Sequence, residues 1–307
     1  MEVSGAVGRD KIKEIMISTV KHMLEHHSLL RNLVPLCRKL GVVHLLHVAK
    51  GNCERLKNVQ QRKEFYNFCK LHRKEFQKLY GMLEDDFSKK TLQKVIEYRI
   101  TWRAKALRGV VTKPQYFPAD IMKPAENEVF IDGGAYVGDT AEDFIKHFVN
   151  RPGDKSSYRK IYAWEPDEIN IRQMKKNLGR YSNIVVIPYG MWKEKAKIGF
   201  SQNGNAGSKI IEDGQRKICV DCIDHLHMSE KVTFIKMDIE GSEKEALLGA
   251  KKVIQRDRPK LAICIYHAPE DLYEIPFLIK TMVPEYRLYL RHHSDTFAET
   301  VVYAVVE

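Results

Sequence analysis

The sequence predicts a doubly wound α/β domain, with a seven-stranded and mostly parallel sheet, that follows an all-α region. Three observations support this prediction. Short apolar runs alternate with helical patterns from about residue 128 onward. The first 110 residues show helical spacing without strand-like alternation. The last two strands lie too close together for a crossover helix, so we expect them to be antiparallel.

Three segments follow from this division of the chain. Residues 1–112 are predicted to be helical, with apolar residues at helical spacing over 12–24, 65–80 and 92–107. Residues 113–127 contain three prolines and are predicted to be a linker. Residues 128–307 form the predicted α/β domain.

The strands and helices of the α/β domain can be read in order along the chain. Asp167 is the expected N-cap of the second helix, and Ser242-x-x-Glu245 has the pattern of a capping box for the third. The predicted strands cover 129–131, 161–164, 184–187, 232–237, 261–265, 286–290 and 300–306. The predicted helices cover 140–149 and 167–178, begin at 242, and cover 269–282.

The composition is typical of a reduced, cytoplasmic protein. The 307 residues are 44% apolar, and we find neither an apolar run that would span a bilayer nor a signal-peptide core. Six cysteines are few for this length. Cys219 and Cys222 form a C-x-x-C within a strand-like stretch, and alternation sends them to opposite faces, which does not suit a shared metal site.

The net charge of +11 is concentrated at the N-terminus. The first 120 residues contain 24 Lys and Arg against 12 Asp and Glu. Such a segment could face a nucleic acid, a membrane surface or an anionic substrate. A solvated helical surface explains the charge equally simply, and we favour that interpretation.

In open α/β sheets the ligand lies beyond the carboxyl ends of the strands. The first strand ends in Asp132-Gly-Gly-Ala-Tyr-Val-Gly-Asp-Thr, which lacks the glycine spacing of a dinucleotide fingerprint. Its two carboxylates would repel a pyrophosphate but suit the cationic amino-acid end of S-adenosylmethionine. We therefore predict that this loop binds that cofactor through Asp132, Gly133, Gly134, Ala135, Tyr136, Gly138, Asp139 and Thr140.

The second and third strands end in residues that suit the nucleoside of the same cofactor. Glu165, followed by Pro166, can accept hydrogen bonds from both hydroxyls of a ribose. Tyr189 and Gly190 follow the third strand and could form a wall for the adenine ring.

The later strand ends carry the residues predicted for catalysis. Asp238 and Glu240 follow the fourth strand, and His267 follows the fifth. Asp238 is also predicted to bind the cofactor. If the final pair is antiparallel, His292, His293 and Glu299 should gather near them. Imidazole titrates near neutral pH, so one histidine could be a general base. An alternative use of His267, His292, His293 and Glu299 is a divalent-metal site.

These strand ends resemble those of the FkbM-type methyltransferase family. The resemblance covers about residues 129 to 304 and depends on four motifs in order: Ile131–Thr140, Trp164–Asp167, Lys236–Glu243, and Leu290–His293 with Glu299–Thr300. It implies a class I, Rossmann-like methyltransferase that uses S-adenosylmethionine to methylate a hydroxyl, often on a sugar or a polyketide-like product. Tyr136 replaces a glycine of the general methyltransferase pattern, as is common in this family. The first 110 residues match nothing that we recognise.

We therefore predict an O-methyltransferase in which Asp238, His267 and Glu240 carry the catalysis. The expected acceptor is a sugar, nucleotide-sugar, glycan or natural product, and not a nucleic acid. The protein is expected to have no membrane span. The N-terminal helices could join two copies of the chain. The alternatives are an RNA methyltransferase that uses the basic N-terminal segment and a non-catalytic protein that binds the cofactor. A nicotinamide oxidoreductase is disfavoured by the glycine pattern.

Overall fold

The computed structural model describes residues 59–149, 157–201, 209–210, 216–226 and 228–306. The chain divides into two compact units, residues 1–67 and 68–307. Of the first unit only residues 59–67 are described, and they are helical. The helix predicted over 12–24 lies outside the described residues, as does the rest of 1–58, which is just under half of the basic N-terminal segment.

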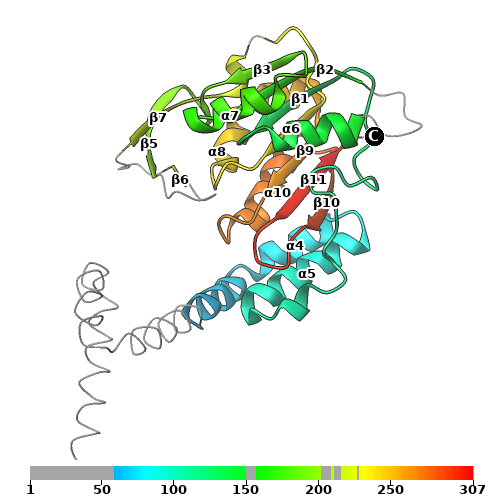
Figure 1. Ribbon diagram of the computed structural model, residues 1–307. Coiled ribbons are helices and arrows are strands. Elements are labelled where there is room, and N and C mark those ends of the chain that lie inside the picture. The colour runs from blue at the N-terminus through cyan, green and yellow to red at the C-terminus, as the bar shows by residue number, and fades with distance from the viewer. Residues whose placement is uncertain (1–58, 150–156, 202–208, 211–215, 227, 307) are drawn as a thin grey trace, which may run out of the picture. The chain divides into compact units, whose positions relative to one another are not determined.

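A seven-stranded sheet forms the centre of the second unit (Figure 1). Its strands are β1 (Glu128–Gly133), β2 (Tyr158–Trp164), β3 (Ile184–Ile187), β8 (Phe234–Met237), β9 (Lys260–Cys264), β10 (Arg287–His292) and β11 (Thr300–Val305). They lie in the order β10-β11-β9-β8-β1-β2-β3. Strand β11 is antiparallel to both of its neighbours, and the other pairs are parallel. The predicted sheet with an antiparallel final pair is confirmed.

A second, four-stranded sheet follows β3 and was not predicted. It consists of β4 (Gly190–Met191), β5 (Ala196–Ser201), β6 (Lys209–Ile210) and β7 (Arg216–Asp221), in the order β4-β7-β5-β6. A short 3-10 helix, η3 (Ile223–His225), comes next. Within and just after β7, Cys219 is exposed whereas Cys222 is buried, and both thiols are free.

The helices of the second unit are α4 (Arg73–Met82), α5 (Asp86–Thr101), η1 (Ala104–Leu107), α6 (Asp139–Asp143) with the π-helical η2 (Phe144–Val149), α7 (Glu168–Leu178), α8 (Glu243–Leu248), α9 (Lys251–Asp257) and α10 (Asp271–Met282). The helices that follow β1, β2 and β9 lie close to their predicted ranges, whereas the helix predicted over 92–107 instead covers Asp86–Thr101, and α9 was not predicted. Asp167 caps α7 as predicted, because its side chain accepts from two backbone N–H groups. The prediction of a capping box at the start of α8 was wrong. Ser242 occupies the N-cap position but makes no side-chain capping hydrogen bond.

An aromatic cluster fills the core on one face of the large sheet. Phe130 of β1 stacks on Phe144 with ring centroids 4.4 Å apart, and Phe234 of β8 lies beside both rings. Phe117, from the segment predicted as a linker, contacts the same cluster. Residues around Phe117 are therefore part of the core of the α/β domain and run close to the ends of its central strands.

Helix α5 is tied to the outer strand β10. The backbone N–H of Leu290 donates to Ser88 Oγ over 2.8 Å. The buried Arg291 donates to the same hydroxyl over 2.9 Å and to Asp85 Oδ2 over 2.7 Å. Because these bonds join buried groups of both elements, α5 is held against the sheet as part of one unit.

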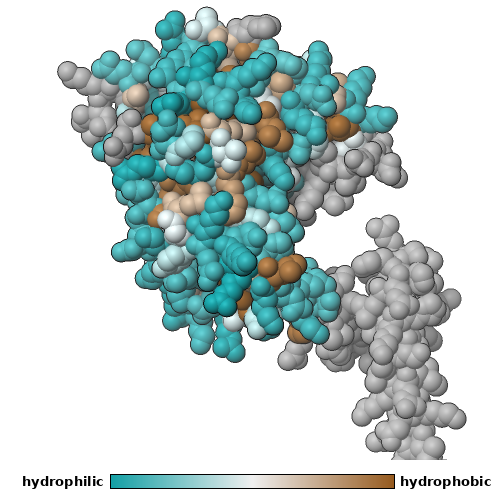
Figure 2. Space-filling view, turned by 180° about the vertical axis from the view of Figure 1, so that it is seen from behind, coloured by the Kyte–Doolittle hydropathy of each residue, from teal (hydrophilic) through white to brown (hydrophobic). Residues whose placement is uncertain are grey.

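Among the described residues, no helix is both long and apolar enough to cross a membrane. The face of the molecule in Figure 2 is mostly hydrophilic, with hydrophobic side chains in small separate groups. Most of the large apolar side chains of the second unit are instead buried around the sheet.

Candidate active site

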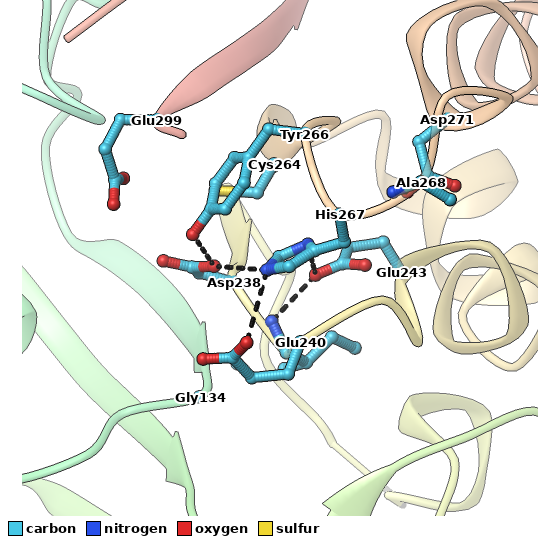
Figure 3. A network of polar contacts seen from close by, with 12 residues as sticks. Gly134, Asp238, Glu240, Glu243, Cys264, Tyr266, His267, Ala268, Asp271 and Glu299 are labelled. Atoms are coloured by element: carbon cyan, nitrogen blue, oxygen red, sulfur yellow. Dashed lines mark hydrogen bonds and ion pairs between the residues drawn. The ribbon is translucent and has the colours of Figure 1, made fainter. Parts of the chain in front are cut away.

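Most of the predicted site residues gather at the carboxyl ends of β1, β2, β8 and β9, where α/β sheets bind their ligands. Asp238 and Glu240 follow β8, and His267 lies three residues beyond β9 (Figure 3). Glu299, which precedes β11, reaches the same region. The sheet order alone produces this convergence, because β1, β8 and β9 are adjacent.

The glycine loop after β1 passes directly against the end of β8. Gly134 has a φ of 72° and Gly138 a φ of 86°, which are values that glycine adopts readily. A Cβ on Gly134 would lie 2.0 Å from the carbonyl oxygen of Asp238. This position therefore requires glycine both for its backbone angle and for space.

A buried ion pair lies beneath the glycine loop. Lys236 Nζ is 3.0 Å from Asp132 Oδ1, and both side chains are almost fully buried. The same ammonium donates to the carbonyls of Gly133 and Gly134, each over 3.0 Å. Burial opposes the charge of Lys236, but the nearby Asp132 and Asp238 carboxylates raise its pKa above the ordinary value. Asp132 thus supports the loop through Lys236.

Glu165 joins the end of β2 to the glycine loop. Its Oε2 accepts from the backbone N–H of Tyr136 over 3.0 Å, and its Oε1 accepts from the N–H of Asp167 over 2.9 Å. Burial raises the pKa of the Glu165 carboxyl. A carboxylate held in this way faces a defined direction at the edge of the loop.

The carboxylate of Asp238 accepts hydrogen bonds from two tyrosines. Tyr116 Oη donates to Oδ2 over 2.8 Å, and Tyr266 Oη donates to Oδ1 over 3.0 Å. Burial raises the pKa of both phenols, and the Asp238 charge adds to the effect. Tyr116 was missed in the sequence because it lies in the supposed linker. The aromatic pair Tyr116-Phe117 between two prolines was the available signal.

His267 is surrounded by carboxylates. Its Nε2 lies 3.6 Å from Asp238 Oδ1 and 3.6 Å from Glu240 Oε2. Its Nδ1 lies 3.2 Å from Glu243 Oε1. Glu240 and Gly241 both have positive φ values, 60° and 95°, so the chain turns tightly after β8. In this turn the Glu240 side chain lies beside the histidine. Glu243 was also missed, although it stands three residues after Glu240 in the same acidic run.

The remaining residues predicted to bind the cofactor lie around this loop. Ala135 is buried, and Tyr136 is exposed with a φ of 49°. Asp139 is exposed in the first turn of α6, and Thr140 follows it there. Half-buried Pro166 and Tyr189, and the buried Gly190, follow β2 and β3. Ligand contact by these residues stays a prediction.

The expected gathering of His292 and His293 around Asp238 was wrong. Both are buried, and their bonds are to other groups. His292 Nδ1 lies 2.9 Å from Thr300 Oγ1, and His293 lies 2.9 Å from the carbonyl of Thr112 and 2.8 Å from Tyr303 Oη. Burial lowers the pKa of each histidine to about 4. They are neutral structural groups between the final strands and the segment near Thr112.

Glu299, in contrast, does lie near Asp238. Burial raises the pKa of its carboxyl, and the Asp238 charge adds to this, while Gln115 donates a hydrogen bond to it. Potential ligand atoms of Asp238, Cys264 and Glu299 lie within 4.8 Å of one another, as do those of Asp238, Glu243 and His267. Neither group is the set of His267, His292, His293 and Glu299 that the sequence offered as an alternative metal site, and metal binding stays a prediction.

Comparison with known proteins agrees with this geometry. A family model described as "Methyltransferase FkbM domain" matches residues 132–297, which is more than half of the chain. Among solved structures, the chain is similar to methyltransferase FkbM from Methylobacillus flagellatus KT, with 29% identity and a TM-score of 0.67. The match covers 78% of this chain but only 60% of that protein.

More distant structures share less with the chain. An rRNA methylase from Streptococcus thermophilus is 13% identical over 62% of this chain and 92% of its own, with a TM-score of 0.38. Aeropyrum pernix fibrillarin, solved in complex with S-adenosyl-L-methionine, is 17% identical over 66% of this chain and 73% of its own, with a TM-score of 0.34. No curated protein sequence matches the chain. The family match and the class I methyltransferase sheet together show that the chain belongs to the FkbM methyltransferase domain family.

Proposed function

We propose that this protein transfers the methyl group of S-adenosylmethionine to a hydroxyl of a small acceptor such as a sugar, nucleotide-sugar, glycan or natural product. Membership of a methyltransferase family supports the reaction class. The observation that carries the proposal is the meeting of Asp238 and His267, 3.6 Å apart, beside the glycine loop. The pair places groups able to accept a proton next to the expected cofactor pocket.

The residues at the strand ends suit this cofactor. The loop from Gly133 to Gly138 turns sharply after β1, because Gly134 and Gly138 adopt positive φ values, and a loop of this kind at a strand end suits the cofactor. The fixed carboxylate of Glu165 suits the two hydroxyls of a ribose. Asp139 is exposed at the loop and suits an ammonium group. When bound, the cofactor supplies a strongly electrophilic methyl group on sulfur.

The protein's part in the reaction is alignment and proton removal. The acceptor oxygen must lie nearly in line with the methyl group and the sulfur. An alcohol becomes an adequate nucleophile only as a base takes its proton. Asp238 and His267 are the candidates for that base, with Glu240 positioning the acceptor. The carboxylates of Asp238, Glu240 and Glu299 around this position would repel a phosphate beside the reacting hydroxyl, which disfavours a ribose of an RNA backbone. A nucleotide-sugar fits the same site when its pyrophosphate lies away from these carboxylates.

A methyl-transfer assay tests this proposal. The full chain is incubated with radiolabelled S-adenosylmethionine and panels of monosaccharides, nucleotide-sugars, oligosaccharides, hydroxylated natural products and RNA. The Asp238→Asn and His267→Ala variants are assayed with the best acceptor at saturating donor. Loss of one general base reduces the rate by about 10²–10⁴-fold. Near-normal rates in both variants, or transfer to RNA alone, would contradict the proposal.

A further inference from the structure

The environment of His267 determines which proton acceptor this site offers. Both ring nitrogens face carboxylate oxygens: Glu243 on the Nδ1 side, and Asp238 and Glu240 on the Nε2 side (Figure 3). The His267 side chain is only 5% exposed, so water cannot easily stand in for either partner. An ionised carboxylate only accepts hydrogen bonds. Both nitrogens can be satisfied together only when each of them carries a proton.

Glu243 is the most deeply buried of these carboxylates. Its side chain is 1% exposed, and its Oε1, which faces His267, also accepts from the backbone N–H of Ile239 over 2.8 Å. Glu243 is the first residue of α8, where the helix dipole favours a negative charge. A buried carboxylate held in this way needs a cationic partner, and His267 is at hand.

We propose that Glu243 is a positioning residue that holds His267 as an imidazolium, and that Asp238 is therefore the base that takes the proton of the acceptor. The first part concerns the resting protein and stands without any acceptor. The second part rests on the proposed function.

Charged and titratable groups from several neighbouring elements face His267. The Tyr266 ring lies against the imidazole at a tilt of 34° with centroids 4.1 Å apart, and the guanidinium of Arg99 donates to the Tyr266 carbonyl over 2.9 Å. The Asp271 carboxyl of α10 and the Glu299 carboxyl before β11 also interact with His267. Burial opposes the charge of His267, but the contact with Glu243 and the charges of the surrounding carboxylates outweigh it and raise the pKa.

The transfer step balances under this assignment. The acceptor oxygen forms a bond to the methyl carbon, and the carbon–sulfur bond breaks, so that its electron pair stays on the sulfur of S-adenosylhomocysteine. The hydroxyl proton passes to the carboxylate of Asp238, which becomes a carboxylic acid. His267 keeps both of its protons throughout and offsets the negative charge of the neighbouring carboxylates.

Nitrogen-15 NMR of the full chain, with labelled histidine, tests the first part directly. The His267 signals are assigned by their loss in His267→Gln. We expect both ring nitrogens to show imidazolium shifts at pH 7. Glu243→Gln should lower the midpoint of the His267 titration by about one pH unit or more, as expected for an opposite charge in contact. Glu245→Gln removes the same charge from the same helix, next to Lys193 rather than His267, and should leave the midpoint unchanged.

Three results would overturn the assignment. One is a neutral His267 at pH 7 in the wild-type protein, which requires no variant to fold. Another is an unchanged midpoint in a folded Glu243→Gln variant. The third is stoichiometric broadening of the His267 signals by added Mn²⁺ at micromolar concentration, since a metal ion would then occupy the place of the proton.

The pH profile of methyl transfer tests the second part. If His267 must stay protonated, kcat/KM falls as the pH rises through the His267 midpoint found by NMR, and Glu243→Gln moves this fall to lower pH by the same amount. If His267 is the base, activity instead rises through that midpoint, which would contradict the proposal. An imidazolium signal in a protein that methylates nothing would reject the proposed function and leave the assignment of Glu243 intact.

Discussion

The substitution Gly134→Ala tests the tightest contact of the site. Gly134 has a φ of 72°, and a Cβ there would lie 2.0 Å from the Asp238 carbonyl oxygen. A left-handed backbone costs an L-residue about 1–2 kcal/mol. Relieving the clash requires the loop or the end of β8 to move, at a further cost of about 1–3 kcal/mol. The expected loss of unfolding free energy is therefore about 2–5 kcal/mol.

The variant should also lose affinity for S-adenosylhomocysteine, because the displaced loop is the expected cofactor contact. Urea denaturation measures the stability, and titration calorimetry measures the affinity, which we expect to fall at least tenfold. The control is Gly81→Ala in α4, where no atom lies within 4 Å of the added Cβ. That change should gain up to about 1 kcal/mol from helix propensity. Wild-type stability and affinity in Gly134→Ala would refute the reasoning.

Three further predictions follow from buried groups. Lys236→Met leaves its buried carboxylate partner without a counter-charge and should lower the unfolding free energy by about 3–5 kcal/mol in urea denaturation; a loss below about 1 kcal/mol would contradict the buried pair. Tyr116→Phe removes one hydrogen bond to Asp238 and should lower stability by about 1–3 kcal/mol, as measured in the same way; an unchanged midpoint would contradict that contact. The lowered pKa values of His292 and His293, about 4, mean that below pH 6.5 the unfolded chain binds protons that the folded chain does not. The free energy of unfolding should therefore fall as the pH is lowered from about 6.5 to about 4. In His293→Gln this fall should be less steep than in the wild-type protein, by about 1.4 kcal/mol per pH unit. Equal slopes for the two proteins, measured by urea denaturation across this pH range, would contradict the prediction.

The sequence predicts the large sheet well because its strands are short apolar runs, and the central ones, β1, β8 and β9, are buried on both faces. The run at Ile184–Ile187 and the alternation of strands with helices leave little choice of topology. Asp167 could be predicted as an N-cap because capping is a local interaction. The small sheet could not be predicted, since β4 and β6 are two residues long and gain their pairing only from distant neighbours.

The sequence predicts a site residue correctly where its place at the end of a strand is enough to bring it to the site. It fails where the direction of the side chain determines whether the residue reaches the site. Asp238 and His267 follow adjacent strands, so the topology alone brings them together. His292 and His293 also end a strand, but Thr300 and Thr112 hold them away from the carboxylates. Tyr116 reaches the site from a segment without regular structure, where the aromatic pair between two prolines indicates packing against the domain but not the contact with Asp238.

The central claim is that this chain binds S-adenosylmethionine at the carboxyl ends of β1, β2 and β8. Titration calorimetry of the full chain with S-adenosylhomocysteine, and separately with NAD, tests it most directly. We predict saturable binding of S-adenosylhomocysteine at micromolar concentration and no binding of NAD. The Glu165→Ala variant should lose the binding of S-adenosylhomocysteine. Binding of NAD without S-adenosylhomocysteine, or binding of S-adenosylhomocysteine that is unchanged in Glu165→Ala, would contradict the account.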